Sequence, residues 1–207
     1  MMIKFKDNNE NILTKKTHKI FCYIMEKILV HACCAPCFIA PYNDLKERFL
    51  VTGFWFNHNI HPIQEYYRRR DTFRDFINNE GIKVIDKDEY GLVDFVQKVV
   101  FREDNRCYQC YYERLNYTAI IANKGNFEYF TTSLLYSKFQ KHDLIKEIAE
   151  SVAKKHSVKF YYQDFRDLWK KGIELSKENN MYRQQYCGCI YSEMDRYLEK
   201  KVNYVFS

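Results

Sequence analysis

The sequence has little glycine and proline, 6 and 3 of 207 residues, against 18 tyrosines and 16 phenylalanines. Glycine and proline mark turns and loops, so their scarcity excludes collagen-like and low-complexity chains and predicts few or short loops. No internal repeat or linker divides the chain. One domain of this length can bury most of the surface that its unfolded chain exposes. We therefore expect a polar, lysine-rich extension over residues 1–24 and a single α/β catalytic domain with an aromatic-rich core over residues 25–207.

Long apolar runs are also missing. The longest, such as residues 28–30 and 54–56, are far shorter than the ~20 residues that cross a bilayer. The first residues carry charges and asparagines in place of the apolar core and cleavage site of a secretory signal. These absences predict a cytoplasmic protein that has no membrane partner. The net charge of +6 is compatible with an anionic partner such as RNA but does not by itself indicate one.

Short apolar segments alternate with longer amphipathic ones along the chain. We expect strands near residues 27–32, 49–56, 82–85, 128–132 and 158–161. Helices are expected near residues 38–49, 61–79, 90–101, 107–123, 144–152 and from about 191, with Gly81 ending the second. Strands that alternate with helices of this length indicate parallel crossover units. The sequence therefore predicts an α/β fold, a parallel sheet flanked by helices.

Eight cysteines stand out in a chain expected in a reducing compartment, where disulfides are rare and metal ligation is common. Cys22 stands alone, and the other seven form three groups. Because the carboxyl ends of parallel strands meet at one edge, a group that follows the first strand lies where ligand sites form. A group that begins a helix benefits from its free N–H groups and positive dipole, which stabilise an anionic cluster. The groups are Cys33, Cys34 and Cys37, then Cys107 and Cys110, then Cys187 and Cys189.

Thiolates are soft ligands, and the pairs fit either a structural zinc or an iron-sulfur cluster. Seven thiols exceed the four that one tetrahedral zinc takes. Consecutive side chains of extended backbone point apart, so we expect Cys33 and Cys34 to suit two neighbouring metals better than one. A cluster beside a second metal, or beside redox-active thiols, would use most of the cysteines.

Several polar residues have both a functional and a structural interpretation. The run Tyr182 to Tyr186 precedes the last cysteines and either contacts cluster sulfurs, substrate or a transferred proton, or simply forms the turn that presents the cysteines. Arg69 and its neighbours fit phosphate contacts, although a solvated helix face is the commoner explanation. His61 follows the second strand and is a substrate-site candidate. His31, Trp55 and Trp169 are expected in the core.

Four runs of the chain resemble the QueH family of epoxyqueuosine reductases, in the family's order. They are HACCAPC at residues 31–37, REDNRCYQCYYER at 102–114, FTTSL at 130–134 and YRQQYCGCIYS at 182–192. The resemblance covers about residues 27–192 and implies a fold related to the nucleotide-binding α/β class (HUP or PP-loop-like). The chain has no SGGxDS or GxxxxGK phosphate loop, and the first cysteine run occupies the place of such a loop, so we expect no ATP dependence.

The resemblance also implies the chemistry, which is the two-electron removal of the epoxide oxygen of epoxyqueuosine at the tRNA wobble position. It implies a 4Fe-4S cluster with an additional iron, no cobalamin, and an external electron donor of the ferredoxin or flavodoxin type. We assign Cys34, Cys107, Cys110 and Cys187 to the cluster and Cys33, Cys189 and Cys37 to the iron. The family accepts Cys or Asp at the position of Cys37. Catalytic candidates are Tyr182, Arg183 and Tyr186, and substrate-binding candidates are His61, Arg69, Arg183 and Gln184.

Two other functions fit parts of the pattern. One is a zinc-stabilised RNA-binding module without redox activity. The other is a cluster-bearing tRNA thiolase, against which the missing phosphate loop counts, since such an enzyme activates its substrate with ATP. Metal content separates the first alternative from the reductase, because iron with sulfide and a single zinc are distinguished directly.

Overall fold

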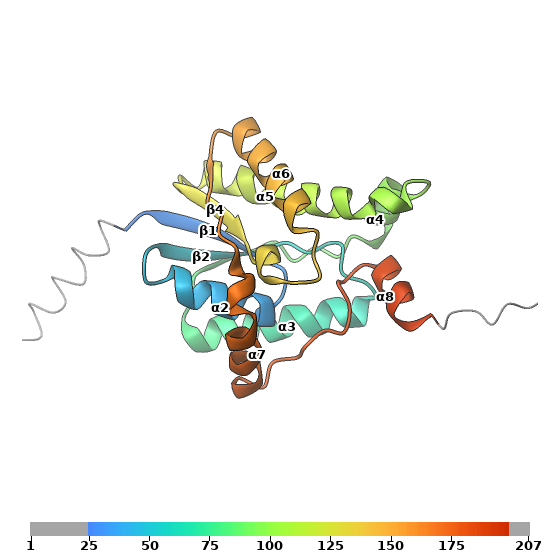
Figure 1. Ribbon diagram of the computed structural model, residues 1–207, viewed down its shortest axis with the longest axis horizontal. Helices are drawn as coiled ribbons and strands as arrows, with labels where there is room; N and C mark the ends of the chain where they lie inside the picture. Colours follow the sequence, from blue (N-terminus) through green and yellow to red (C-terminus); the bar gives the residue numbers. More distant parts are fainter. Residues whose placement is uncertain (1–24, 199–207) are drawn as a thin grey trace, which may run out of the picture.

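The structure is a computed structural model that describes residues 25–198 (Figure 1). Strands and helices alternate through most of this range. Their order is β1 (Lys27–Ala32), α2 (Ala35–Leu45), β2 (Leu50–Trp55), α3 (Ile63–Glu80), β3 (Val84–Asp86), α4 (Leu92–Val99), α5 (Arg106–Lys124), β4 (Tyr129–Thr132), α6 (His142–Lys155), β5 (Lys159–Phe160), α7 (Trp169–Glu178) and α8 (Ile190–Tyr197). Short 3-10 turns lie at Glu103–Asn105, Ser133–Tyr136 and Phe165–Leu168.

The five strands form one sheet in the order β3-β2-β1-β4-β5, and every neighbouring pair is parallel. The α/β fold with a parallel sheet flanked by helices is therefore confirmed, while its relation to the nucleotide-binding class stays a prediction. From β1 the chain first adds strands on one side, through β2 and β3, and then on the other, through β4 and β5. This reversal leaves a crevice at the carboxyl ends of β1 and β4, where ligands bind in open α/β sheets.

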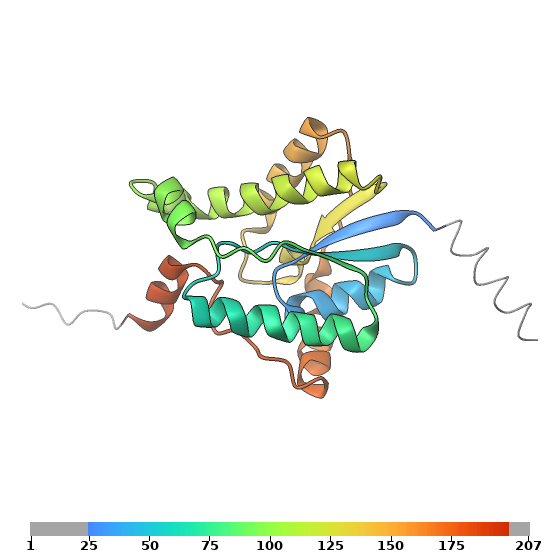
Figure 2. The same ribbon diagram turned by 180° about the vertical axis from the view of Figure 1, so that it is seen from behind.

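Helices cover both faces of the sheet. Figures 1 and 2 show α5 and α6 on one face and α2, α3 and α7 on the other. Between them the core is rich in aromatic rings, as predicted. Trp55 stacks on Phe73 at 5.3 Å between ring centroids, and Phe38 meets Phe73 edge to face at 5.4 Å. Burial of such large rings dominates the stabilisation of a core. Within residues 25–198, no helix combines the length and apolar character needed to cross a membrane.

Several boundaries differ from the sequence expectation by a few residues. α2 begins at Ala35 and not at Phe38, because Pro36 occupies its first turn, a position that needs no backbone donor. β5 has only two residues, Lys159 and Phe160. The end of α3 agrees with expectation, since Gly81 adopts the left-handed conformation there with φ 64°.

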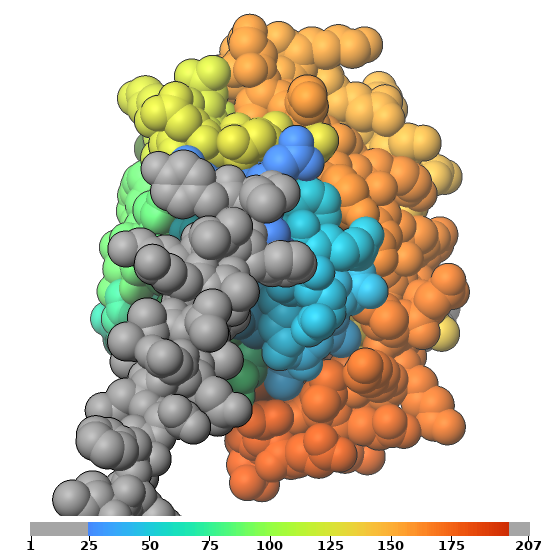
Figure 3. All heavy atoms as spheres, turned by 90° about the vertical axis from the view of Figure 1, so that its left-hand side faces the viewer, coloured from blue at the N-terminus to red at the C-terminus, as the bar shows by residue number. Residues whose placement is uncertain are grey.

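The amino ends of the strands lie at the edge opposite the crevice. Figure 3 views this side, where the cyan segment before β2 lies against orange segments from the second half of the chain. Arg48 holds the two together by donating to the Tyr161 hydroxyl at 2.6 Å and to Gln163 Oε1 at 3.0 Å. Hydrogen bonds between side chains thus hold the segments together at the amino edge, and the loops that can form a site lie at the opposite, carboxyl edge.

Candidate metal centre

Three segments that are distant in sequence bring seven cysteines to the carboxyl side of the sheet. They are the turn from β1 into α2, the first turns of α5, and the loop over residues 182–189 that joins α7 to α8 (Figure 1). None of the seven thiols within residues 25–198 forms a disulfide. Cys22 lies outside the described residues. The arrangement is a concentration of thiols at the place where the fold forms its ligand crevice.

The first group is compact, because the sulfurs of Cys33, Cys34 and Cys37 all lie within 4.8 Å of one another. Cys33 and Cys34 are 4.0 Å apart from sulfur to sulfur, so the expectation that these two side chains point apart is wrong. The reason is that β1 ends at Ala32 and the chain bends at Cys33, before Cys34 caps α2. Cys37 follows in the first turn of the helix and completes the group.

Within the first group, the pKa of one thiol is shifted down and the pKa values of the other two are shifted up. Hydrogen bonds from Cys34 and Cys37, together with the Ser133 hydroxyl, hold the pKa of Cys33 well below its ordinary value. Burial raises the pKa of Cys34, and the bond to Cys33 raises that of Cys37. Ser133 donates to the Cys33 sulfur at 3.2 Å and accepts the Cys33 backbone N–H at 2.9 Å. Binding of a metal by this group would displace the protons of its thiols, as thiolate ligation requires.

The second group of the structure combines the two cysteines of α5, Cys107 and Cys110, with the two of the loop before α8, Cys187 and Cys189. Cys110 and Cys189 are buried in one small cluster with Phe95 and Val99. Burial raises the pKa of Cys110, and the neighbouring sulfurs of Cys187, Cys189 and Cys107 raise it further. Cys110 therefore lies near enough to the other three thiols for their charges to act on it. Cys187 is the most accessible cysteine of residues 25–198.

Donors point at the sulfur atoms of both groups. Gln184 Nε2 donates to Cys34 Sγ at 2.9 Å and to Cys37 Sγ at 3.5 Å, and Gln140 Nε2 donates to Cys187 Sγ at 3.3 Å. Arg114 Nη2 donates to Cys110 Sγ at 3.0 Å. Neutral thiols are weak acceptors, whereas metal-bound thiolates accept such bonds readily. The donor set therefore fits metal-bound thiolates.

The loop over residues 182–189 is held by α3. Arg69 and Glu65, both buried, form an ion pair at 2.7 Å, and the Arg69 guanidinium also donates to the carbonyls of Cys187 at 2.8 Å and Tyr186 at 3.0 Å. Tyr182 donates its hydroxyl to Glu65 Oε2 at 2.6 Å. Gly188 adopts φ 145° beside Arg69, where a Cβ atom would lie 3.3 Å from Nη1. Packing against α3 therefore accounts for the glycine between the last two cysteines.

A cavity of about 550 Å³ opens beside both cysteine groups. Cys33 and Cys37 line it from the first group and Cys187 from the second, with Arg69, Arg114 and Arg183 among the charged lining residues. Its rim is aromatic. Trp169 stacks on Tyr136 at 5.2 Å and meets Phe139 at 5.6 Å, and Phe139 is 84% exposed. The volume suits a nucleoside-sized ligand.

The predicted polar site residues divide between the cavity and its support. Arg183, Gln184 and Tyr186 line the cavity together with Arg69. The Tyr186 hydroxyl donates a hydrogen bond to the His61 carbonyl at 2.5 Å, so His61 supports the loop that lines the cavity.

Other residues lie away from where the sequence suggested. His61 is buried and does not line the cavity, and burial lowers its pKa to about 4. Arg69 is 2% exposed, so the solvated-face alternative for it is wrong. Trp169, expected in the core, lines the cavity, whereas Trp55 and His31 are buried as expected.

Sequence reasoning missed the residues that contact sulfur from outside the cysteine segments. Ser133 and Gln140 follow β4, and Glu65 anchors the last loop from α3. Ser133 lies within the FTTSL run, and Arg114 ends the run that begins at Arg102, so both could have been singled out. Gln140 and Glu65 belong to no motif that would identify them.

A second group of possible metal ligands comes from α4, α5 and the loop after β2. Atoms of His58, Asp94 and Glu113 lie within 4.8 Å of one another. Lys98 pairs with both carboxylates, and His58 Nε2 also pairs with Glu113. Both carboxylates thus already have a cationic partner in Lys98, so this group does not by itself indicate a metal.

A doubly wound parallel sheet with thiols in two groups around one cavity defines an α/β protein whose site is suited to metal binding. The family model for "Epoxyqueuosine reductase QueH" matches residues 28–195. Relatives with that name occur in Dehalococcoides mccartyi, 37% identical over 83% of this chain and 94% of the relative, and in Thermotoga maritima, 32% identical over 83% and 93%. A Streptococcus pyogenes relative is 29% identical over 82% and 71%. The chain belongs to the epoxyqueuosine reductase QueH family, and is thus an oxidoreductase of tRNA modification.

Proposed function

We propose that this chain removes the epoxide oxygen of epoxyqueuosine in tRNA by a two-electron reduction. The observation that carries the proposal is the gathering of seven thiols on the carboxyl side of the sheet in a chain of this family, with three of them, Cys33, Cys37 and Cys187, lining one nucleoside-sized cavity. Two electrons and two protons convert the epoxide into the alkene of queuosine and water. The electrons come from an external donor of the ferredoxin or flavodoxin type, with no cobalamin or ATP.

All seven cysteines are proposed as ligands of a 4Fe-4S cluster and an additional iron. When bound, such a centre takes up electrons and delivers them to the substrate. Cys107, Cys110 and Cys187 belong to the cluster and Cys33 and Cys37 to the iron. The ligand roles of Cys34 and Cys189 can be assigned in two ways. The sequence favours Cys34 as the fourth cluster ligand and Cys189 as an iron ligand. The grouping of the sulfurs supports the reverse, with Cys189 beside Cys110 and Cys34 beside Cys33.

The cavity's own residues account for binding of the modified base and its neighbours. Arg183 is exposed and lines the cavity, where its fixed charge can meet a phosphate of the anticodon loop. Phe139 and Trp169 offer ring faces and edges at the rim. Single-stranded bases splay out and stack on such rings, which is the usual basis of RNA loop recognition.

Proton delivery is proposed to involve the loop over residues 182–189. The Tyr182 and Tyr186 hydroxyls donate to Glu65 and to the His61 carbonyl, and burial raises the pKa of both tyrosines. Both are therefore protonated at neutral pH. Tyr186 lines the cavity and Tyr182 does not, so Tyr186 is the better placed of the two.

The test is anaerobic purification followed by iron, sulfide and zinc analysis and by turnover of tRNA that carries epoxyqueuosine. We expect several irons with sulfide, and queuosine formation with a chemical low-potential reductant. Cys110→Ala should lose cluster and activity together, whereas Cys22→Ala, outside the three segments, should keep both. A colourless protein that contains one zinc and gives no queuosine would favour the RNA-binding module.

Two further variants decide the division of ligands. If Cys34 belongs to the cluster, Cys34→Ala loses sulfide and most iron, while Cys189→Ala loses only the separate iron. If the grouping of the sulfurs sets the division, the two results exchange. Sulfide and iron quantification on both variants gives the answer.

A further inference from the structure

Arg114 is a buried cation without a carboxylate partner among residues 25–198. It lies on α5, is 2% exposed, and reaches the cavity wall. Its Nη2 donates to Cys110 Sγ at 3.0 Å and its Nε to the Cys110 carbonyl at 3.1 Å. The other buried arginine of the site, Arg69, is by contrast paired with Glu65. Arg114 therefore has sulfur where Arg69 has a carboxylate.

Burying an unpaired charge is costly, so something must balance Arg114. The acceptors that the described residues offer its guanidinium are the sulfur and the carbonyl oxygen of Cys110, and Cys33 and Cys187 line the same cavity as Arg114. A neutral thiol cannot supply this compensation. The arginine is therefore matched to sulfur that carries negative charge, as a thiolate bound to a metal centre does.

We infer that Arg114 raises the reduction potential of the metal centre held by Cys110 and Cys187. The inference rests on the proposed function, and it assigns Arg114 a role through the centre, not on the substrate. Each electron accepted from the external donor adds one negative charge beside a fixed cation, which favours the reduced state. The N–H···S hydrogen bond acts in the same direction, since hydrogen bonds to sulfur and local charge set the potential of iron-sulfur sites.

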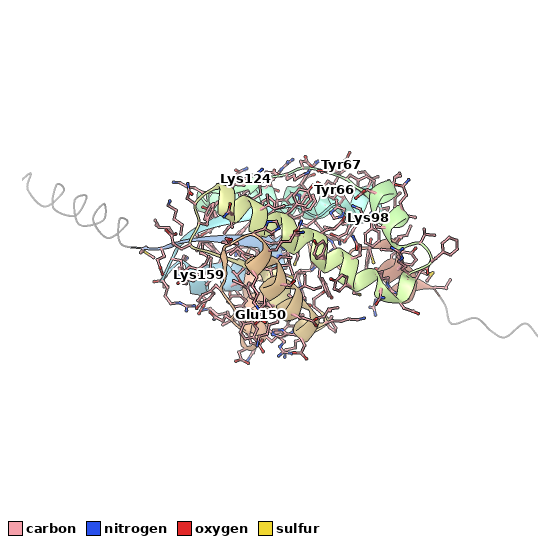
Figure 4. All side chains as sticks on the ribbon, turned by 90° about the horizontal axis from the view of Figure 1, so that it is seen from above. Tyr66, Tyr67, Lys98, Lys124, Glu150 and Lys159 are labelled. Atoms are coloured by element: carbon pink, nitrogen blue, oxygen red, sulfur yellow. The ribbon has the colours of Figure 1, made fainter. Side chains whose placement is uncertain are left out.

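The experiment is an anaerobic redox titration of the loaded protein, followed by visible and EPR spectra, on wild type and variants. Arg114→Met and Arg114→Gln remove the charge at similar length, and Arg114→Lys keeps it. Lys124→Met is the control, because it removes an exposed charge from the far end of the same helix, ten residues or ~15 Å away (Figure 4). Solvent and salt screen a charge at that distance.

We expect the Met and Gln variants to lower the equilibrium constant for one-electron reduction by about tenfold or more, a shift of about 59 mV. The potential of Arg114→Lys should stay nearer to the wild-type value, and the potential of Lys124→Met should equal the wild-type value. An unchanged potential in a fully loaded Met or Gln variant overturns the inference.

The remaining outcomes are also decisive. If the neutral variants fail to hold iron, retention in Arg114→Lys supports the role of charge, and loss in all three overturns it because shape alone is then required. Wild-type protein that holds no iron-sulfur centre rejects the proposed function itself. A loaded, active wild type with insensitive variants rejects only the role of Arg114.

Discussion

Single side chains decide how the first cysteine group binds metal, and Cys37 is the most informative. It lies in the first turn of α2 beside Cys33 and Cys34. A carboxylate binds iron but replaces thiolate poorly in a cubane. We predict that Cys37→Asp keeps the cluster and measurable reductase activity, whereas Cys37→Ala keeps the cluster and loses the extra iron. Iron and sulfide quantification with cluster spectroscopy checks this, and collapse of the cluster in the Asp variant would place Cys37 in the cubane.

Because His31 and His61 are buried, we predict that the folded protein loses stability in acid. Burial lowers the pKa of His31 to about 4, helped by the charge of Arg114, and burial lowers that of His61 to about 4. Below their unfolded pKa of ~6.5 the unfolded chain binds protons that the folded one excludes, so stability is present above this pH and falls as pH drops toward 4.

Each histidine should contribute a slope of about 1.4 kcal/mol per pH unit within that window. Urea unfolding of the metal-free protein at intervals from pH 7.5 to 4.5 measures it, with the metal-free form used so that loss of ligated metal does not add to the slope. A flat profile would mean that both histidines bind protons in the folded protein as readily as in the unfolded chain, and half of the expected slope would mean that one of them does.

Among the elements, α3 supports the site without supplying a cysteine. Its Arg69 and Glu65 hold the loop over residues 182–189. Removing one partner of a buried ion pair leaves the other charge uncompensated, so Arg69→Leu should lower the free energy of unfolding by about 3–5 kcal/mol. Chemical denaturation of the metal-free protein measures the loss, and protease cleavage within the loop should become faster.

The neighbouring Arg68 is exposed and provides the matched control, with an expected change within about 0.5 kcal/mol for Arg68→Leu. The double variant Glu65→Leu/Arg69→Leu should regain part of the loss, since it leaves no lone charge. Equal effects of the two arginine variants would show that the pair does not hold the loop.

The elements themselves could be predicted from sequence, because apolar runs and helix ends such as Gly81 are local signals. The parallel direction of the strands could be predicted from the alternation of strands and helices. The close approach of Cys33 and Cys34 could not, since it depends on where β1 gives way to the N-cap of α2. The contact between the loop over residues 182–189 and α3 could not be predicted either, because Tyr182 and Glu65 are 117 residues apart in the chain.

For the whole molecule, the aromatic rim predicts where tRNA contacts the protein. Stacking of one base on an aromatic side chain contributes about 1–3 kcal/mol, so Phe139→Ala should weaken tRNA binding about tenfold or more. Phe101 is 93% exposed but does not line the cavity, and Phe101→Ala should bind like wild type. Fluorescence or mobility-shift titration with the anticodon stem-loop measures both. Equal affinities for all three proteins would move the RNA surface elsewhere.

Residues 25–207 are proposed to contain the complete catalytic domain. Deletion of residues 1–24 should then leave iron content and activity within error of the full chain, because β1 and every cysteine of the three groups remain. The deletion also removes Cys22. A truncated protein that loses its cluster would give the extension or Cys22 a role in the metal centre.

The long separation of the cysteine groups along the chain also bears on synthesis. During translation the turn after β1 is made first, so Cys33, Cys34 and Cys37 are present well before the loop with Cys187 and Cys189 exists. A metal captured at that stage would meet only three of the seven thiols. The full set of thiols becomes available only after residue 189 has been made and the three segments have come together.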